Sequence, residues 1–302
     1  MRISFNEVRR NKINSFILIS LFIILIGFIG GAIGLYFDNI YIGLIIAMVF
    51  SIIYSLIAYK QGGNMVLKLT GAKPVTKRQY PHLYHTIEGL ALAAGIKAPK
   101  AYIIEDDAMN AFATGTNPDN AAITVTTGLL KKLNRQELEG VVAHEMAHIK
   151  NYDIRFMILA TVLIGIVSLL SHFMLRMFFY GGARNMPKNP RVALPLIIVM
   201  VILVILAPIF SQMIKLAISR KREYMADATG AILTRYPPGL ASALRKIGKD
   251  AKQLKAANSS NAHLFIYSPF KSKKSKKKKR FYKGLFSTHP PIEERISRLE
   301  QM

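Results

Sequence analysis

Residues 142–149 read Val142-Ala143-His144-Glu145-Met146-Ala147-His148-Ile149 and contain the pattern His-Glu-x-x-His. The preceding residues predict a helix, because Asn134 suits an N-cap, Glu137 can complete a capping box, and apolar side chains recur at helical spacing. On this helix the imidazoles of His144 and His148 lie one turn apart on one side. They can hold one metal ion, with the carboxylate of Glu145 beside it. This arrangement is typical of zinc hydrolases, in which the metal lowers the pKa of a bound water and a carboxylate takes its proton.

A zinc site of this kind needs a third protein ligand, and residues 219–227 can supply it. They read Ser219-Arg220-Lys221-Arg222-Glu223-Tyr224-Met225-Ala226-Asp227. Glu223 and Asp227 are four residues apart and therefore share one face of a helix. We predict that Glu223 completes a His2Glu site and that Asp227 accepts a hydrogen bond from a ligand imidazole, which orients the ring. The alternative is a charged helix surface on which both carboxylates pair with neighbouring basic residues.

The two motifs together resemble the gluzincin pattern, and further segments resemble the HtpX-type membrane zinc endopeptidases, relatives of the type-I prenyl-protein protease. These segments are Asn110-Ala111-Phe112-Ala113, Ile123-Thr124-Val125-Thr126-Thr127-Gly128-Leu129-Leu130, Ser219-Arg220-x-x-Glu223-Tyr224-x-Ala226-Asp227 and Thr288-His289-Pro290-Pro291. The resemblance implies a zincin-like domain, one Zn²⁺ per chain and quality control of misfolded membrane proteins. It also implies that His289 steadies the oxyanion and that Asn110 touches substrate. The alternatives are a helix cap for His289 and a turn residue for Asn110.

The composition supports a membrane protein with a carboxylate and imidazole metal site. Of the 302 residues, 51% are hydrophobic, and none is cysteine, which excludes disulfides and thiolate ligands. The formal net charge is +24, so an anionic partner has to be considered, either nucleic acid or acidic lipid.

Four apolar stretches are long enough to cross a bilayer as helices. Residues 16–37 and 40–59 carry no charge and leave only Asp38 and Asn39 for a tight hairpin turn. Residues 154–175, apart from Arg155 and His172, and residues 192–214 predict a second pair of spans. His172 is not included in the metal site, because a lone histidine near the end of a span is more often packed or interfacial. The alternatives are a signal peptide for residues 1–37 and a buried or re-entrant hairpin for the second pair.

The distribution of Lys and Arg predicts which regions face the cytoplasm. Residues 1–14 contain 4, residues 60–153 contain 11 and residues 215–302 contain 21, whereas the turn 38–39 has none. By the positive-inside rule these three regions are cytoplasmic, and so is the active site of this multi-pass protein of the cell membrane. The four basic residues in the loop 176–191 run against the rule.

We therefore divide the chain into four regions. Residues 1–60 are an N-terminal transmembrane hairpin, and residues 61–153 are the first part of the catalytic domain with the His-Glu-x-x-His helix. Residues 154–215 are a second transmembrane hairpin. Residues 216–302 are the second part of the catalytic domain, with the glutamate ligand, a basic loop and a C-terminal helix.

The polar regions predict a small α+β domain. We expect a helix over Pro81–Ala94 and short strands over residues 101–104, 111–114 and 122–127. The metal helix is expected to run to Asp153. In zincins an edge strand lies near the metal, and a substrate can pair with it as an added strand. We also expect a helix starting near Pro238 and a last helix with Ile292, Ile296 and Leu299 on one face. The predicted fold is a mainly α integral membrane protein with about four transmembrane helices and a cytoplasmic zincin-like α+β domain carrying a small β-sheet.

The run from Lys271 to Arg280 holds eight positive charges in ten residues and cannot pack into a core. Beside a membrane its nearest polyanion is acidic lipid. The alternative is a solvated loop that binds no specific partner. Nucleic acid is not favoured, because the run has no interleaved aromatic residues and no reading module.

The predicted function is that of a membrane-bound zinc metalloendopeptidase acting on unfolded or membrane-protein polypeptides, with Glu145 as the general base. Two alternatives stay open: a catalytically silent metal-binding scaffold, which has no need of Glu145, and a prenyl-peptide-type processing protease, which needs a larger helical cage than four spans enclose. A transporter or channel is not favoured, because the apolar stretches lack ionisable groups at their centres.

Overall fold

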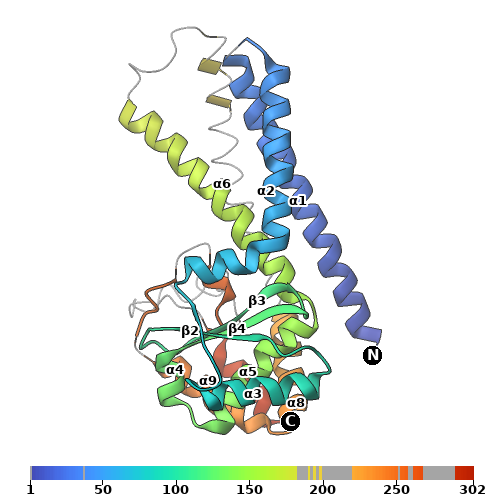
Figure 1. Ribbon diagram of the computed structural model, residues 1–302, viewed down its shortest axis with the longest axis vertical. Coiled ribbons are helices and arrows are strands. Elements are labelled where there is room, and N and C mark those ends of the chain that lie inside the picture. Colours follow the sequence, from blue (N-terminus) through green and yellow to red (C-terminus); the bar gives the residue numbers. More distant parts are fainter. Residues whose placement is uncertain are drawn as a thin grey trace.

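The structure is a computed structural model that describes residues 2–36, 38–181, 190, 193–194, 197–198, 220–250, 252–257, 261–267 and 290–302. Two long apolar helices form a hairpin that rises from a mixed α+β domain (Figure 1). Helix α1 spans Arg2–Tyr36 and helix α2 spans Ile40–Leu69. The tight turn between them is as predicted: Asp38 has a φ of 57°, and the Asn39 side chain caps α2 by accepting from the Ile42 N–H.

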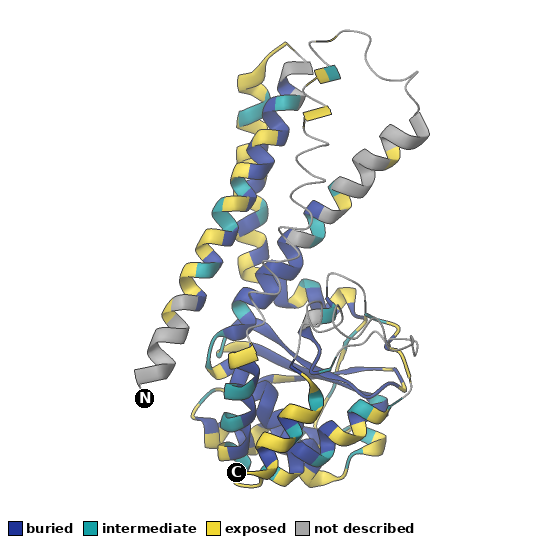
Figure 2. Cartoon of the chain, turned by 180° about the vertical axis from the view of Figure 1, so that it is seen from behind, coloured by how far each residue is buried: buried dark blue, intermediate teal, exposed yellow. Residues whose placement is uncertain are grey.

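Both helices of the hairpin have the length and composition of a membrane span, α1 over Asn11–Ala32 and α2 over its full length. Many of their apolar residues are exposed, as the yellow segments along the hairpin in Figure 2 show, whereas others such as Leu18 and Phe22 are buried. Phe16, Ile24, Ile45 and Ile46 are each more than half exposed. Such a continuous apolar surface is unfavourable in water and suits a lipid environment.

The α+β domain contains a mixed four-stranded sheet with the strand order β1-β2-β4-β3. Its strands are β1 (Lys73–Pro74), β2 (Lys100–Ile104), β3 (Ala111–Asn117) and β4 (Asn120–Thr126). The three longer strands overlap the predicted ones, with β3 three residues longer at its end than predicted. β2 and β4 pair in parallel, whereas β3 and β4 form an antiparallel hairpin, so β3 lies at the edge of the sheet.

Helices pack on this sheet and on one another, and helix α5 is the most buried among them. They are α3 (Pro81–Ala94), α4 (Thr127–Lys132), α5 (Arg135–Lys150), α8 (Arg220–Thr234), α9 (Pro237–Lys249) and α11 (Ile292–Glu300), with a 3₁₀ turn at Ala262–Leu264. The predicted helices near residues 81, 238 and 292 are confirmed. From Leu138 onward nearly every side chain of α5 is buried, because it contacts α3, α8, α9 and the edge strand β3.

Helix α6 (Asp153–Gly181) leaves the domain beside α2 and then diverges from the hairpin (Figure 1). The prediction that the metal helix runs to Asp153 is wrong. α5 ends at Lys150, and Tyr152, with a φ of 59°, turns the chain before α6 begins. Most of the predicted fourth span, the basic run 271–280 and His289 lie outside the described residues.

Candidate metal centre and active site

The amino-terminal cap of α5 fixes the helix that carries the His-Glu-x-x-His motif. Asn134 Oδ1 accepts from the Glu137 N–H at 2.9 Å, and Glu137 Oε2 accepts from the Asn134 N–H at 2.8 Å, which is the predicted capping box. Glu137 also accepts from Ser242 and Lys246 on α9, each at 2.7 Å. Burial alone would raise the pKa of Glu137, but the hydrogen bonds from Lys246, Ser242 and the Asn134 N–H outweigh it and lower the pKa.

Three ligand side chains from two helices converge at one point. The Nε2 atoms of His144 and His148 lie 3.2 Å apart. Glu223 Oε2 is 3.9 Å from His144 Nε2, and Glu223 Oε1 is 3.5 Å from His148 Nε2. One ligand atom from each residue lies within 4.8 Å of the others, and all three residues are buried. Two imidazoles and one carboxylate suit a divalent ion such as zinc and leave a coordination position open for water.

Each ligand histidine is held by a carboxylate at its other ring nitrogen. Asp227 Oδ1 lies 2.9 Å from His144 Nδ1, where the helical spacing with Glu223 predicted a partner. Asp153 Oδ2 lies 3.0 Å from His148 Nδ1, a contact that sequence reasoning missed. In both pairs the Nδ1–H donates to the carboxylate, so Nε2 is left free for a metal.

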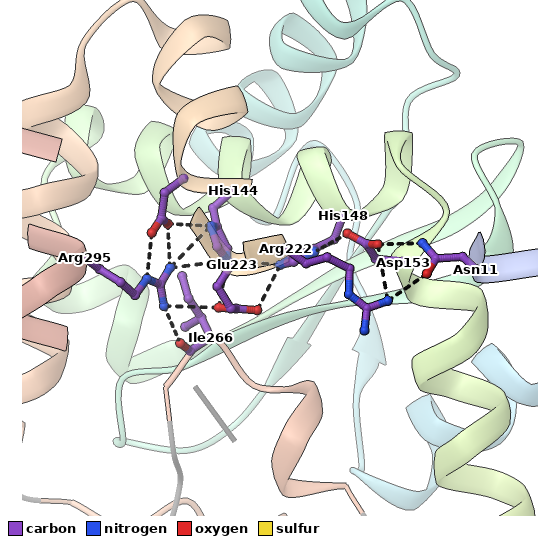
Figure 3. A network of polar contacts seen from close by, with 9 residues as sticks. Asn11, His144, His148, Asp153, Arg222, Glu223, Ile266 and Arg295 are labelled. Atoms are coloured by element: carbon purple, nitrogen blue, oxygen red, sulfur yellow. Dashed lines mark hydrogen bonds and ion pairs between the residues drawn. The ribbon is translucent and has the colours of Figure 1, made fainter. Parts of the chain in front are cut away.

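Arg295, on the last helix, is a buried member of the site that sequence reasoning also missed (Figure 3). Its Nε and Nη2 donate to the two oxygens of Asp227 at 2.8 and 2.7 Å, and its Nη1 donates to the Ile266 carbonyl at 3.2 Å. Nη1 also lies 3.4 Å from Glu223 Oε2. The sequence did hold a signal, because Arg295 occupies the apolar stripe of α11, three residues after Ile292 and four before Leu299.

Glu145 stands beside the ligands with its carboxylate fixed by the edge strand. The side chain is 3% exposed and accepts a hydrogen bond from the Ala113 N–H of β3. Burial raises the pKa of Glu145 to about 7, against the opposing charge of His148 and with the help of Glu223. A carboxyl group that titrates near neutral pH can take a proton and return it within one catalytic cycle.

The two histidines differ in their affinity for a proton. Burial works against the imidazolium form of His148, but the hydrogen bond to Asp153 and the charge of Glu223 outweigh it and raise its pKa to about 9. Burial lowers the pKa of His144, as does the nearby Arg295 charge. In the absence of metal, one proton on His148 therefore balances part of the negative charge, and a metal ion must displace it.

The segment 261–267 closes the site from the side of the edge strand. The Ile266 N–H donates to the Ala111 carbonyl of β3 at 2.9 Å, and Asn110 Nδ2 donates to the Tyr267 carbonyl at 3.1 Å. Phe265 packs against Phe112 with a centroid distance of 5.1 Å. Residues of this segment, β3 and α6 surround the ligands and leave a cavity of about 10 Å³, room for about one water molecule.

The structure thus brings Glu145, Asp227 and the three metal ligands together. It places Asn110 directly before β3, against the segment that closes the site, and His289 lies outside the described residues. The sequence did not reveal Asp153 or Arg295, nor Asn11 and Arg222, which contact Asp153 from α1 and α8.

Comparison with known proteins places these features in a family. The model of Peptidase family M48 matches residues 77–302. A curated protein named Protease HtpX homolog, from Dictyoglomus turgidum, is 43% identical over 298 residues, which cover 99% of this chain and 94% of that protein. One of the same name from Listeria monocytogenes serotype 4a is 44% identical over 308 residues, covering 99% of each. The crystal structure of S. mikatae Ste24p matches with a TM-score of 0.52 at 21% identity, over 85% of this chain and 58% of that longer one, and shows the shared fold.

Proposed function

The chain belongs to peptidase family M48 and is a metalloprotease with His144, His148 and Glu223 as its metal site, and we propose that it is a zinc endopeptidase that degrades misfolded membrane proteins. The main support for peptide hydrolysis is the convergence of these three ligands beside Glu145. An isolated metal-binding scaffold has no need of a buried carboxylate fixed in this position. Near-full-length similarity to proteases excludes that alternative.

The residues of the site divide the catalytic work between them. His144, His148 and Glu223 would hold the zinc ion, which when bound lowers the pKa of a water molecule and polarises the scissile carbonyl. Glu145 takes the proton of the attacking water and passes it to the leaving amine. Asp227 and Asp153 keep the imidazoles in the tautomer that binds metal. His289 is proposed to steady the oxyanion, as its imidazole N–H can donate to a negatively charged oxygen.

The edge of β3 is the proposed position of the substrate. An extended peptide can add to this edge and use the Ala111 carbonyl as an acceptor, with Asn110 donating to a peptide carbonyl. The segment 261–267 makes these same two hydrogen bonds, so it has to move aside before a substrate can bind. Because Leu264, Phe265 and Ile266 fill the cleft, it suits apolar side chains. Misfolded membrane proteins expose such side chains.

We propose that the chain crosses the cell membrane four times with the active site on the cytoplasmic side. The α1–α2 hairpin supplies two candidate spans, α6 begins the third, and residues 192–214 complete the set. The four regions 1–60, 61–153, 154–215 and 216–302 follow from this topology. The basic run from Lys271 to Arg280 would then face acidic lipid.

The decisive experiment uses the full chain in liposomes with one zinc ion per chain. We expect it to cleave casein and a misfolded membrane protein, to lose activity with a chelator, and to recover it when zinc is restored. Glu145→Gln should keep zinc and lose cleavage, whereas Glu139→Gln, on the same helix, should keep both. Normal cleavage by Glu145→Gln would rule out the mechanism. Equal cleavage of the folded and misfolded forms of one membrane protein would rule out the proposed substrate class.

A further inference from the structure

The first membrane helix contributes a side chain to the metal centre. Asn11, the first residue of the α1 span, is 2% exposed and has both ends of its amide engaged (Figure 3). Its Nδ2 donates to Asp153 Oδ1 at 2.8 Å and lies 3.4 Å from the Asn151 carbonyl. Its Oδ1 accepts from Arg222 Nη1 at 2.7 Å. A buried amide bonded in this way is held in one orientation.

Each of the two side chains that Asn11 contacts is linked to a different metal ligand. Asp153 holds His148 through its other oxygen at 3.0 Å, and Arg222 directly precedes the ligand Glu223 on α8. An amide suits this position because it can donate to a carboxylate and accept from a guanidinium at the same time. Asn11 is therefore one hydrogen bond away from the partner of His148 and next to the helix that carries Glu223.

The same part of α1 also contacts the turn that places Asp153. This turn joins α5 to α6 through Tyr152, whose φ of 59° is unfavourable for a bulky side chain. Lys12, adjacent to Asn11, lies over the Tyr152 ring at 5.8 Å from its centroid. Two successive residues of α1 thus contact the three residues 151–153. A turn of this conformation depends on its surroundings to persist, and α1 forms part of them.

We propose that Asn11 is a positioning residue for the metal centre, through which the first membrane helix sets the orientation of His148. The Asp153 carboxylate is buried, and the Asn11 amide satisfies the oxygen that does not face the histidine. Without this donor that oxygen keeps only the longer contact with Arg222 at 3.8 Å, so the carboxylate and the imidazole that it holds are less firmly oriented. The family match begins at residue 77, so this contribution comes from outside the matched region. The inference requires metal binding by the site, and it is independent of the substrate class proposed above.

The expected size of the effect follows from the distance to the metal. Loss of a residue that orients a ligand histidine weakens metal binding by about 10- to 100-fold, which is the expectation for Asp153→Asn. Asn11 acts one hydrogen bond further out, so we expect Asn11→Leu to weaken zinc binding by about three- to tenfold. Asn11→Asp keeps the size of the side chain and the acceptor for Arg222 but removes the amide donor, and it should weaken binding to a similar extent.

The test measures metal binding, and does not depend on cleavage. Zinc affinity of the full chain in detergent is determined by competition with a chelator, and the visible spectrum of the cobalt-substituted protein reports the ligand geometry. Ser15→Ala is the matched control. Ser15 is buried one turn further along α1, donates to the Asn11 carbonyl, and forms no hydrogen bond with Asp153 in the described part of the chain. Thermal melting of the metal-free protein identifies any variant that fails to fold. If Asn11→Leu fails to fold, Asn11→Asp is used for the test in its place.

Weaker zinc binding and an altered cobalt spectrum in the Asn11 variants, with neither change in Ser15→Ala, would support the proposal. An Asn11 substitution that acts through Asp153 should add little in the Asp153→Asn background. The proposal is overturned if the Asn11 variants bind zinc as the wild type does. It is also overturned if the effects of Asn11→Leu and Asp153→Asn are fully additive.

Discussion

Replacing Arg295 by methionine tests how much the site depends on a single buried cation. The guanidinium is 2% exposed and makes two hydrogen bonds to Asp227, at 2.8 and 2.7 Å. Methionine fills a similar space without charge, so Arg295→Met leaves the buried Asp227 carboxylate without its cation. Breaking a buried ion pair by removing one partner costs about 3–5 kcal/mol. We expect the free energy of unfolding of the metal-free protein to fall by this amount.

Zinc should reduce this loss, and the comparison gives the prediction a second criterion. Arg295 Nη1 lies 3.4 Å from Glu223, so the guanidinium also balances the charge of the ligand set. A bound divalent ion supplies that balance itself. The destabilisation by Arg295→Met should therefore be larger in the metal-free protein than in the zinc-loaded protein, as measured by denaturant unfolding of both forms in the same detergent.

Two further variants separate the buried pair from general damage to α11. Arg245→Met, on α9, breaks an exposed pair with Glu300 of α11, and should cost about 0–1 kcal/mol. Combining Arg295→Met with Asp227→Asn should recover part of the lost stability, because a neutral amide leaves no buried unpaired charge. The reasoning is refuted if Arg295→Met is as stable as Arg245→Met, or if the double variant is no more stable than Arg295→Met.

Three other substitutions, one of them with a matched control, test the supports of the site. Glu137→Gln should lower the free energy of unfolding by about 1–3 kcal/mol at pH 7. The pKa of Glu137 is lowered from 4.5, so the stability that its carboxylate contributes is present above pH 4.5 and is lost as the pH falls through the lowered value. The difference in unfolding free energy from the wild type should therefore be smaller near pH 3. Gly230→Ala places a Cβ 3.1 Å from the backbone of His144, so it should lower the free energy of unfolding by about 1–3 kcal/mol and weaken zinc binding. Its control, Gly89→Ala, places a Cβ with nothing within 4 Å and should raise the free energy of unfolding by about 0.5–1 kcal/mol. Similar melting temperatures of the two variants would contradict this. Phe265→Ser should raise kcat/KM for a short peptide by up to about tenfold, which is the gain expected if the segment 261–267 occupies the cleft in about nine-tenths of the molecules. A lower kcat/KM at full zinc content would contradict the proposed competition between this segment and the substrate.

Local sequence patterns were enough to predict the elements that carry the ligands. The capping box at Asn134 and the apolar periodicity after it lie within one helix, so they can be read without knowing any contact between distant segments. The His144 and His148 spacing and the four-residue separation of Glu223 and Asp227 are also local. For this reason the sequence predicts the ligand helices as well as the strands of the sheet.

The missed residues depend on segments that are far apart in the sequence. Asn11 meets Asp153 across 142 positions, and Arg295 meets Asp227 across 68. An asparagine near the start of a span is usually interfacial, and no local period distinguishes this one. Asp153 was read as the end of the metal helix because the turn at Tyr152 has no glycine or proline to mark it. Only Arg295 carried a local sign, its position on the apolar face of α11.

Each ligand histidine is held by a carboxylate and a further side chain, and the two sets of hydrogen bonds lead to opposite ends of the chain. His144 bonds to Asp227, which is held by Arg295 on the last helix, and His148 bonds to Asp153, which is held by Asn11 on the first. In the structure the carboxylate that orients each ring is itself held by a side chain of a terminal helix. If Asn11 acts as proposed, docking of the membrane hairpin tightens metal binding by about three- to tenfold. The chain would then bind zinc most tightly once its first membrane helix is packed against the metal centre.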